Sequence, residues 1–439
     1  MAMLRHGFGG LVLTTKPGER AEWEMYCHAA SRQDDLRVFG ANGALRFNFL
    51  RWEASRSGEG AGMVENIVAL FSTVMEVVDR GSGGSEGRDD GTYWKRATKQ
   101  LLRNAVDLLL LADRPVSVPD LYRVVISAPT SAAQKRSAEW QAQSLCFQAL
   151  SAADRRERSA CQQADLEVVA DYWLCEFPEL ADKTRSIVIS TFTSMADVLM
   201  RGVLRELYCT ETNITPEAVS DGAIILLDLP VKTYADVGTI AQVLFKYSFQ
   251  RAIERRDVRR TPRPVFLWAD EAQNFVTSYD ASFQQTCRSA RVATVYLTQN
   301  LSNMYAALGG QEKGKAEAAS VLGNLTLKVM HANGDPGTNE WAASLIGRSR
   351  QFLANGNTSR SADSGWPMSL GIEALSQPTT TSAGFSEAWE YEVQPAAFTR
   401  LKTGGPANGW EVEALLFQNG KRFHSTGKTW VPVTFKQRH

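Results

Sequence analysis

The first 60 residues alternate between short apolar runs and one amphipathic segment. Residues 10–15 form a short apolar run, which the turn at residues 16–19 closes. Residues 21–31 then place Trp23 and its apolar neighbours at helical spacing, and residues 36–39 are again apolar. Strand, helix and strand in this order predict a parallel α/β unit.

The segment from about residue 62 to residue 209 has a different pattern. Its apolar residues recur at intervals of three and four, as in Ile67, Leu70, Phe71 and Val74. This period predicts a block that is mainly helical. Inside it, residues 81–91 are rich in glycine and have no apolar period, so we expect a flexible loop between two helices there.

The α/β pattern returns after residue 222. Residues 223–229 are a continuous apolar run of the kind that is buried on both faces of a parallel sheet. A helix is then predicted over residues 237–256, a strand over 265–269, a helix near 282–289 and a strand over 293–298. The helical block therefore looks inserted into one parallel-sheet domain.

The end of the chain predicts edge strands. Residues 392–435 alternate apolar and polar positions around glycines, above all in 415–423 and 430–435, as half-exposed strands do. Residues 351–387 are rich in Ser, Thr, Gly and Asn, and we expect a mobile surface loop. The chain is therefore predicted to divide into three parts. Residues 1–60 form the first part of the sheet domain, residues 61–215 form a helical insertion, and residues 216–439 form the second part of the sheet domain with the last strands.

Composition excludes several classes of protein. The 439 residues are 44% hydrophobic and 22% charged, which excludes a disordered chain. Lys plus Arg and Asp plus Glu both total 48, so no global field attracts nucleic acid or an anionic membrane. The longest apolar runs are far shorter than the roughly 18 residues of a membrane span, and the start lacks the order of a signal peptide. These features predict a soluble, cytoplasmic chain.

Two adjacent carboxylates follow one of the predicted strands. Asp270 and Glu271 come directly after the apolar run that ends at Ala269. This places both acids at the carboxyl edge of the sheet, where open α/β folds bind ligands. In P-loop ATPases the first acid of such a pair supports Mg²⁺, and the second orients or deprotonates the attacking water. The alternative is a solvated helix start, where acids are ordinary structure.

The next strand ends in a second polar tip, Thr298, Gln299 and Asn300. A glutamine at this edge can sense the γ-phosphate of a nucleotide, while the alternative is a helix cap by Asn300. Arg288 is predicted on the helix between the two strands. It either faces phosphate or the next subunit, or it is an ordinary surface arginine.

The sequence contains no phosphate-binding loop of the form G-x-x-x-x-G-K-[ST]. Gly427, Lys428 and Thr429 imitate the end of the motif, but Arg422 stands where the first glycine belongs and the segment alternates like a hairpin. This match therefore does not predict a phosphate-binding loop. Without the loop's backbone amides and lysine, we do not expect tight ATP binding by this chain in isolation.

Two weaker features remain open between a functional and a structural interpretation. The glycines of residues 58–62 precede a predicted helix and form either an anion nest or a plain hinge. A group of arginines near the end of the long helix is either a local nucleic-acid contact or the usual placement of cations at a helix end: Arg251, Arg255, Arg256, Arg259, Arg260 and Arg263.

The ordered set of these motifs resembles the TraG/TraD family of conjugative coupling proteins of type IV secretion. The residues that carry the resemblance are Gly9 to Leu13 with the turn at 16–19, Phe47 to Leu50, the helical block, Trp268 to Glu271, Arg288 with Thr298 and Gln299, and Leu401 to Gly405. The resemblance implies an α/β fold, namely a RecA-like P-loop NTPase sheet with an inserted all-α domain that faces the relaxosome or the secreted substrate.

The resemblance also implies roles for residues. By that analogy ATP and Mg²⁺ are the cofactors, Asp270 supports Mg²⁺ through water, and Lys16 joins Asp270 in cofactor binding. Glu271 is the catalytic base, Gln299 the sensor, and Arg288 a looser match. Relatives carry the P-loop and its helix just before the first strand, so we expect an amino-terminally truncated member; Thr14 and Thr15 also replace an acidic position of many relatives.

The implied function is a coupling-protein ATPase domain that recruits a relaxosome or substrate protein and drives DNA toward a type IV secretion channel. The intact family protein is implied to be a homo-hexamer at the cytoplasmic face of the inner membrane. Two alternatives stay open. One is an FtsK-type DNA translocase, and the other is a non-catalytic recognition module that binds its partner through the helical block.

Overall fold

A computed structural model describes residues 1–81, 89–359 and 380–437 of the chain. These residues divide into two compact units. The first comprises Met1–Thr298 and Asn303–Asn324, and the second comprises Gln299–Ser302 and Leu325–His439. Each unit has its own sheet and its own hydrophobic core.

The first unit is built on a five-stranded sheet in the order β2-β3-β1-β4-β5. All of its strand pairs are parallel, as the sequence predicts. β1 lies at the centre, and Gly10 is required there because an added Cβ would lie 2.4 Å from the ring of Phe266. The strands are β1 (Gly9–Leu13), β2 (Leu36–Gly40), β3 (Ile224–Asp228), β4 (Val265–Ala269) and β5 (Val292–Tyr296).

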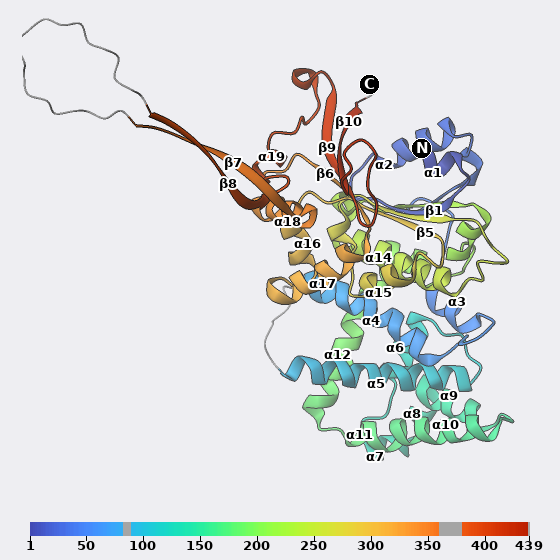
Figure 1. Cartoon of the computed structure of the whole chain (residues 1–439). Coiled ribbons are helices and arrows are strands. Elements are labelled where there is room, and N and C mark those ends of the chain that lie inside the picture. Colours follow the sequence, from blue (N-terminus) through green and yellow to red (C-terminus); the bar gives the residue numbers. More distant parts are fainter. Residues whose placement is uncertain (82–88, 360–379, 438–439) are drawn as a thin grey trace, which may run out of the picture. The chain divides into compact units, whose positions relative to one another are not determined.

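Helices cover both faces of this sheet. α1 (Ala2–Arg5) and α2 (Glu19–Ala29) lie on one face, and α14 (Val231–Arg255) and α15 (Tyr279–Thr286) lie on the other (Figure 1). Alternate residues of each strand serve the two faces. Val12 packs in the core cluster of Trp23 on α2, whereas Leu11 and Leu13 belong to the cluster that contains α14.

The two central connections run in opposite directions across the sheet. From β1 the chain passes through α2 to β2, and from β3 it passes through α14 to β4. Because such crossovers are right-handed, opposite directions place their helices on opposite faces. The loops that leave the carboxyl end of β1 therefore diverge from those that leave β3 and β4, and this opens crevices on both sides of β1.

The predicted helical block is confirmed. The loop expected at residues 81–91 falls mainly on residues 82–88, which lie outside the described part; at its two ends, α4 reaches Gly81 and α5 begins at Asp89. After α3 (Phe49–Ser55), the helices are α4 (Val64–Gly81), α5 (Asp89–Leu111), α6 (Val118–Ile126), α7 (Ala132–Lys135), α8 (Ala138–Gln143), α9 (Leu145–Asp154), α10 (Ala160–Asp171), α11 (Phe177–Glu179), α12 (Asp182–Leu199) and α13 (Gly202–Tyr208).

A helix that crosses a bilayer must be both long and apolar. In the described part of the chain, no single helix meets both requirements. α12 and α13 meet them only when they are counted together, and the two helices meet at an angle of 84°.

The second unit has an antiparallel sheet in the order β10-β9-β6. The two strands predicted near the end of the chain are present, although the first begins and ends about four residues earlier than expected. The elements are β6 (Leu327–His331), β9 (Glu411–Gln418), β10 (Trp430–Lys436), α18 (Pro336–Ile346) and α19 (Pro395–Phe398). Between the sheets along the chain lie α16 (Leu301–Ala307) and α17 (Gln311–Asn324).

The mobile loop expected over residues 351–387 is wrong for its described part. β7 (Arg348–Ser359) and β8 (Thr380–Tyr391) pair as an antiparallel ribbon along their whole length. Composition misled the prediction, because small polar residues are typical of loops but a long ladder of backbone hydrogen bonds can still hold them in a ribbon. Residues 360–379 of the expected loop lie outside the described residues. The domain division at residues 60 and 215 stays a prediction.

A buried ion pair joins α14 to the segment that follows β4. Lys246 of α14 bonds to Asp280, and neither side chain is exposed to solvent. Asp280 also accepts hydrogen bonds from the Thr277 backbone N–H (2.6 Å), Gln250 Nε2 (2.8 Å) and the Tyr296 hydroxyl (2.6 Å). Burial alone would raise the pKa of Asp280, but the attraction of Lys246 and these donors keeps it below its ordinary value.

A second group of carboxylates lies inside the helical block. Burial of Asp107 on α5, with repulsion from Asp165 on α10, raises the pKa of Asp107 to about 6. The charged form of Asp107 is therefore unfavourable in the folded protein.

We expect Lys246→Met to destabilise the first unit by about 3 to 5 kcal/mol, because it leaves a buried carboxylate without its counter-charge. The double variant Lys246→Met with Asp280→Asn should cost less than the sum of the two single changes. Denaturant unfolding measures this. The control is Arg201→Met, which removes an exposed pair with Asp197 and should cost about 0.5 kcal/mol or less. Equal losses in Lys246→Met and the control would contradict the assignment.

Asp107 predicts a pH dependence of stability. Its folded pKa of about 6 lies above the unfolded value, so the folded state binds more protons and stability falls as the pH rises from about 4 to about 6. Asp107→Asn should remove this fall and stabilise the protein at pH 8. We expect about 1 to 2 kcal/mol, because the site is only partly screened from solvent. Thermal unfolding at about pH 4 and at pH 8 measures the effect, and the exposed Asp154 provides the control variant, Asp154→Asn.

Candidate functional site

The strands β1 and β4 end side by side, and polar residues follow both of them. Leu13 pairs with Ala269 in the parallel register, so the next residues of the two strands meet at the carboxyl edge. The Thr15 hydroxyl donates to the backbone carbonyl of Asp270 at 3.0 Å. Lys16 Nζ lies 3.2 Å from Asp270 Oδ2 and 3.9 Å from Glu271 Oε1. The structure thus brings Lys16, Asp270 and Glu271 together.

A buried glutamine of α14 holds the end of β1 in place. Gln242 accepts from the Thr14 backbone N–H at 2.7 Å and donates to the carbonyls of Thr14 (2.9 Å) and Leu229 (2.8 Å). The Thr14 hydroxyl donates to the carbonyl of Leu227 at 2.6 Å. These bonds satisfy backbone groups that the sheet ladder leaves unpaired at the ends of β1 and β3. The sequence analysis missed Gln242, whose signal was a polar residue within the apolar stripe of a long helix.

The backbone turns sharply at Glu271. Its φ is 50°, in the left-handed region that few residues other than glycine adopt, and the residue is only 8% exposed. The backbone N–H of Glu271 donates to Asp270 Oδ1 at 3.0 Å. Such strain persists where the surrounding structure over-determines the conformation, which is common at functional sites.

Gln273 connects Glu271 to the end of β5. Its Nε2 donates to Glu271 Oε2 at 2.7 Å, and its Oε1 accepts from the Thr298 hydroxyl at 2.9 Å. The carboxylate of Glu271 is thereby oriented by a side chain that also contacts the polar tip of the next strand. The sequence analysis assigned no role to Gln273, because its two partners are separated along the chain.

The charges of the site influence one another. The hydrogen bond from Lys16 to Asp270, with the attraction of Asp270 and Glu271, raises the pKa of Lys16. Burial raises the pKa of Glu19, although the backbone N–H groups of Thr15 and Lys16 donate to its carboxylate at 2.9 and 3.1 Å. The Lys16 side chain is still 54% exposed, so its ammonium group is accessible to a ligand.

Arg288 does not join this group within one chain. It lies exposed in the turn after α15, two residues beyond the helix on which it was predicted. Because this turn leads into β5, Arg288 lies at the amino edge of the sheet, whereas Asp270 lies at the carboxyl edge. A contact with the next subunit stays a prediction. Gln299 is exposed and belongs to the second unit, where its backbone carbonyl accepts from Asn333 Nδ2 at 2.6 Å; its sensor role also stays a prediction.

The arginine group near the end of α14 makes mainly structural contacts. Arg255 pairs with the buried Glu53 at 2.7 Å, and Arg263 donates to the carbonyl of Gly7 at 2.7 Å. Arg251 bonds to Tyr279 and Asn66, and Arg256 bonds to the carbonyl of Ala290. The contacts of these four arginines fit the structural alternative, and a nucleic-acid contact stays a prediction.

The glycines of residues 58–62 form a turn before α4. Gly58, Gly60 and Gly62 all have positive φ. The carbonyl of Gly60 accepts from Arg56 at 2.8 Å and from Asn66 at 3.0 Å. Both bonds stabilise the turn itself, so these glycines have a structural role. An anion nest stays a prediction.

The donor set of the Lys16 site fits one half of a Mg²⁺-nucleotide site. Mg²⁺ keeps several waters and is held by one or two carboxylates with substrate phosphates. Asp270 offers such a carboxylate, beside the hydroxyl of Thr15. No group of three or more His, Cys, Asp or Glu side chains within the described ranges is arranged to ligate a metal directly. The phosphate half does not fit, because the 439 residues contain no phosphate-binding loop.

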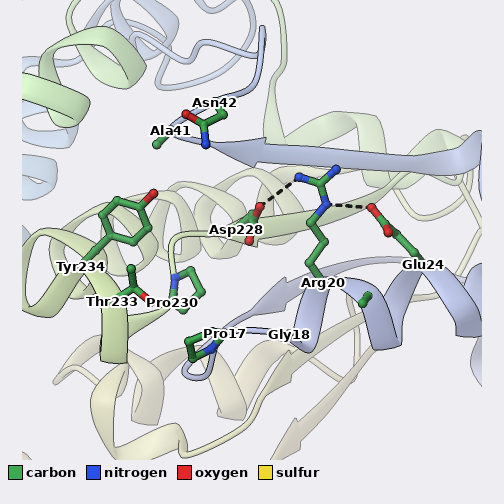
Figure 2. Close-up of a pocket in the computed structure, with 11 residues that line it drawn as sticks. Pro17, Gly18, Arg20, Glu24, Ala41, Asn42, Asp228, Pro230, Thr233 and Tyr234 are labelled. Carbon is green, nitrogen blue, oxygen red and sulfur yellow. Dashed lines mark hydrogen bonds and ion pairs between the residues drawn. The ribbon is translucent and has the colours of Figure 1, made fainter.

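A second crevice lies on the other side of β1, between the ends of β1 and β3. It encloses a cavity of about 410 Å³. Figure 2 shows Arg20 between two acids, with its guanidinium 3.2 Å from Asp228 and 2.7 Å from Glu24. Open α/β sheets bind ligands at such switch points, where neighbouring strands send their connections to opposite faces. The lining is Pro17, Gly18, Arg20, Ala21, Glu24, Ala41, Asn42, Asp228, Pro230, Thr233 and Tyr234.

Comparison with known families concerns the part of the chain that begins at β4. Residues 264–382 match the family described as the TraM recognition site of TraD and TraG. The match shows a likeness to the TraG/TraD coupling proteins in this part of the chain. Among curated protein sequences, no significant match was found.

Solved structures of a coupling protein share the fold. The unbound monoclinic form of the bacterial conjugative coupling protein TrwBdeltaN70 is 12% identical, with a TM-score of 0.60 over 100% of this chain and 80% of that one. The plasmid coupling protein TrwB in complex with ADP and Mg²⁺ is 13% identical, with a TM-score of 0.55 over 100% and 87%. The predicted fold class, a RecA-like α/β sheet with an all-α domain, is confirmed.

The contact between Lys16 and Asp270 predicts a change in lysine reactivity. Asp270→Asn removes the hydrogen bond that raises the pKa of Lys16, so more of the amine is unprotonated near neutral pH and its acetylation should be faster. Limited acetylation followed by peptide mass spectrometry measures this. The matched control is the exposed Lys232 of α14, whose rate should not change. An unchanged rate at Lys16 would show that the ion pair is absent in solution.

Proposed function

We propose that this chain is the motor domain of a conjugative coupling protein, which drives DNA transfer by ATP hydrolysis. The observation that carries the proposal is the group of Lys16, Asp270 and Glu271 at the adjoining ends of β1 and β4. The match of residues 264–382 to the TraM recognition site of TraD and TraG supports it, and so does the likeness in fold to a coupling protein solved with ADP and Mg²⁺.

Each residue has a distinct part in this mechanism. Bound Mg²⁺-ATP supplies the phosphoanhydride whose cleavage drives transfer, and a phosphate-binding loop is also required. Asp270 would hold Mg²⁺ through its water ligands, and Lys16 would offset negative charge beside it. Glu271 would orient the attacking water and accept its proton at a carboxylate oxygen. Gln273 keeps that carboxylate in place through its 2.7 Å hydrogen bond.

Gln299 and Arg288 keep the roles that the resemblance implies for them. Gln299 would sense the γ-phosphate after β5. Arg288 lies at the opposite edge of the sheet from Asp270, so it would act on the site of the next subunit in a homo-hexamer. The partners proposed are DNA, a relaxosome or substrate protein, and a type IV secretion channel at the cytoplasmic face of the inner membrane. The name of the matching family, a TraM recognition site, supports a relaxosome partner.

A second candidate function is a non-catalytic recognition module. Large apolar side chains exposed on the helical block favour it: Tyr93 (53%), Ile126 (52%) and Val168 (67%). They lie on three different helices, α5, α6 and α10, and single exposed apolar residues are common on proteins, so this support is weaker than that for the motor domain. The FtsK-type translocase is less well supported, since the all-α domain matches that of TrwB.

The decisive experiment compares Glu271→Gln with the unchanged protein in the complete product of the reading frame that contains this chain. We expect DNA-stimulated ATP hydrolysis to fall by about 10²- to 10⁴-fold, because the glutamine cannot accept the proton of the attacking water. Nucleotide binding should remain. DNA transfer between cells should fall with hydrolysis.

The matched control is Glu22→Gln, which neutralises an exposed acid of α2 that lies outside both crevices. It should leave hydrolysis unchanged. If Glu271→Gln abolishes neither hydrolysis nor transfer, whereas replacement of Tyr93 and Val168 abolishes partner binding, the recognition module is the better assignment.

A further inference from the structure

The ribbon of β7 and β8 carries a surface that the motor mechanism does not use. Arg348 pairs with Tyr391 and the register continues to Ser359 with Thr380 (Figure 1). No other strand in the described part of the chain pairs with either of them. An isolated two-stranded ribbon is only marginally stable in water, so contacts of its side chains with a partner would add to its stability.

The two faces of the ribbon differ in their chemistry. Residues directly opposite each other in an antiparallel pair project to the same face. Arg348 with Tyr391 and Arg350 with Trp389 therefore share one face, and their charged groups lie 4.5 and 5.9 Å from the two ring centroids. The other face of this segment carries Ser349 opposite Glu390 and has no cation.

Trp389, Arg348 and Arg350 are exposed on the first face, whereas Tyr391 is half-buried and packs against the core of the second unit. Trp389 is 62% exposed, although tryptophan is usually buried to a large extent. The side chain of Arg350 is 64% exposed, and its nearest acid is Glu387 at 3.9 Å, also exposed. A pair of this kind contributes little energy, so Arg350 can exchange Glu387 for a stronger anionic partner.

We propose that this face of the ribbon, formed by Arg348, Arg350, Trp389 and Tyr391, binds single-stranded nucleic acid. An unpaired base stacks on the exposed ring of Trp389, and the two arginines bind the phosphates beside it. Stacking on aromatic rings combined with arginine contacts is the usual chemistry of single-strand binding. The inference deepens the proposed function and rests on it for the class of the partner.

The dimensions of the ribbon suit this ligand. Same-face positions along a strand repeat every two residues, about 7 Å. Each nucleotide of a stacked strand rises about 3.4 Å, so two nucleotide steps also span about 7 Å. The Arg348 and Arg350 pairs are therefore spaced two nucleotide steps apart. A duplex would not place its bases on Trp389, because its bases are already stacked in the helix.

The test uses the full chain and a labelled oligothymidylate of about 16 nucleotides, with fluorescence anisotropy across a series of salt concentrations. Trp389→Ala should weaken binding about tenfold or more, while Trp389→Phe, which keeps a ring, should retain most of it. The double variant Arg348→Gln with Arg350→Gln should lower the slope of log K against log salt by about 1.4, which corresponds to two lost phosphate contacts.

The charge-matched control is Arg400→Gln with Arg422→Gln, two exposed arginines outside the ribbon. It should leave the slope unchanged. Equal slopes in the two double variants, full binding by Trp389→Ala, or tighter binding of a duplex of the same length would each overturn the proposal. Failure here with intact hydrolysis that depends on Glu271 would leave the proposed function standing. If the motor function is lost but single-strand binding is retained, the proposed function fails and the binding face on the ribbon stands.

Discussion

The buried ion pair between Lys246 and Asp280 is the constraint on which the arrangement of the site depends. An uncompensated charge in a protein interior is costly, so each partner must find the other for this sequence to fold. Asp280 also accepts from the Tyr296 hydroxyl, which places β5, and Lys246 donates to the carbonyl of Phe275 at 2.7 Å. The segment between Glu271 and Asp280 is therefore held at its far end against α14. Its near end, the strained turn at Glu271, is held by β4.

The central position of β1 explains why two crevices occur. Its connection leaves toward one face, and those of its neighbours leave toward the other. One crevice brings Lys16 to Asp270 and Glu271, and the other holds Arg20 between Asp228 and Glu24. Two side-chain amides position the groups between β1 and β4: the buried Gln242 fixes the end of β1, and the half-buried Gln273 joins Glu271 to Thr298. The first crevice thus has charged groups that face solvent and uncharged groups that position them.

The second unit follows a different rule. Its three-stranded sheet buries a small core around Met330, Leu415 and Phe417, whereas the β7 and β8 ribbon has no further strand to pair with among the described residues. The sequence predicted a loop over residues 351–387 because the segment is rich in small polar residues. Backbone pairing decides the outcome there, and Tyr391 at the end of β8 packs against the core of the second unit.

The sequence by itself determined the elements and the edge at which the chemistry lies. Apolar runs of strand length separated by amphipathic helices specify a parallel sheet, and the carboxyl ends of parallel strands must share one edge, so the amino-acid pattern alone assigns Asp270 and Glu271 to that edge. The tertiary structure alone decided the strand order, the pairing of Lys16 with Asp270, the roles of Gln242 and Gln273, and the separation of Arg288 from the site. The physical reason is that hydrophobic periodicity is local, whereas a buried polar side chain is determined by a partner far along the chain. Gln242 and Thr14 are 228 residues apart, and nothing in the residues near either one identifies the other.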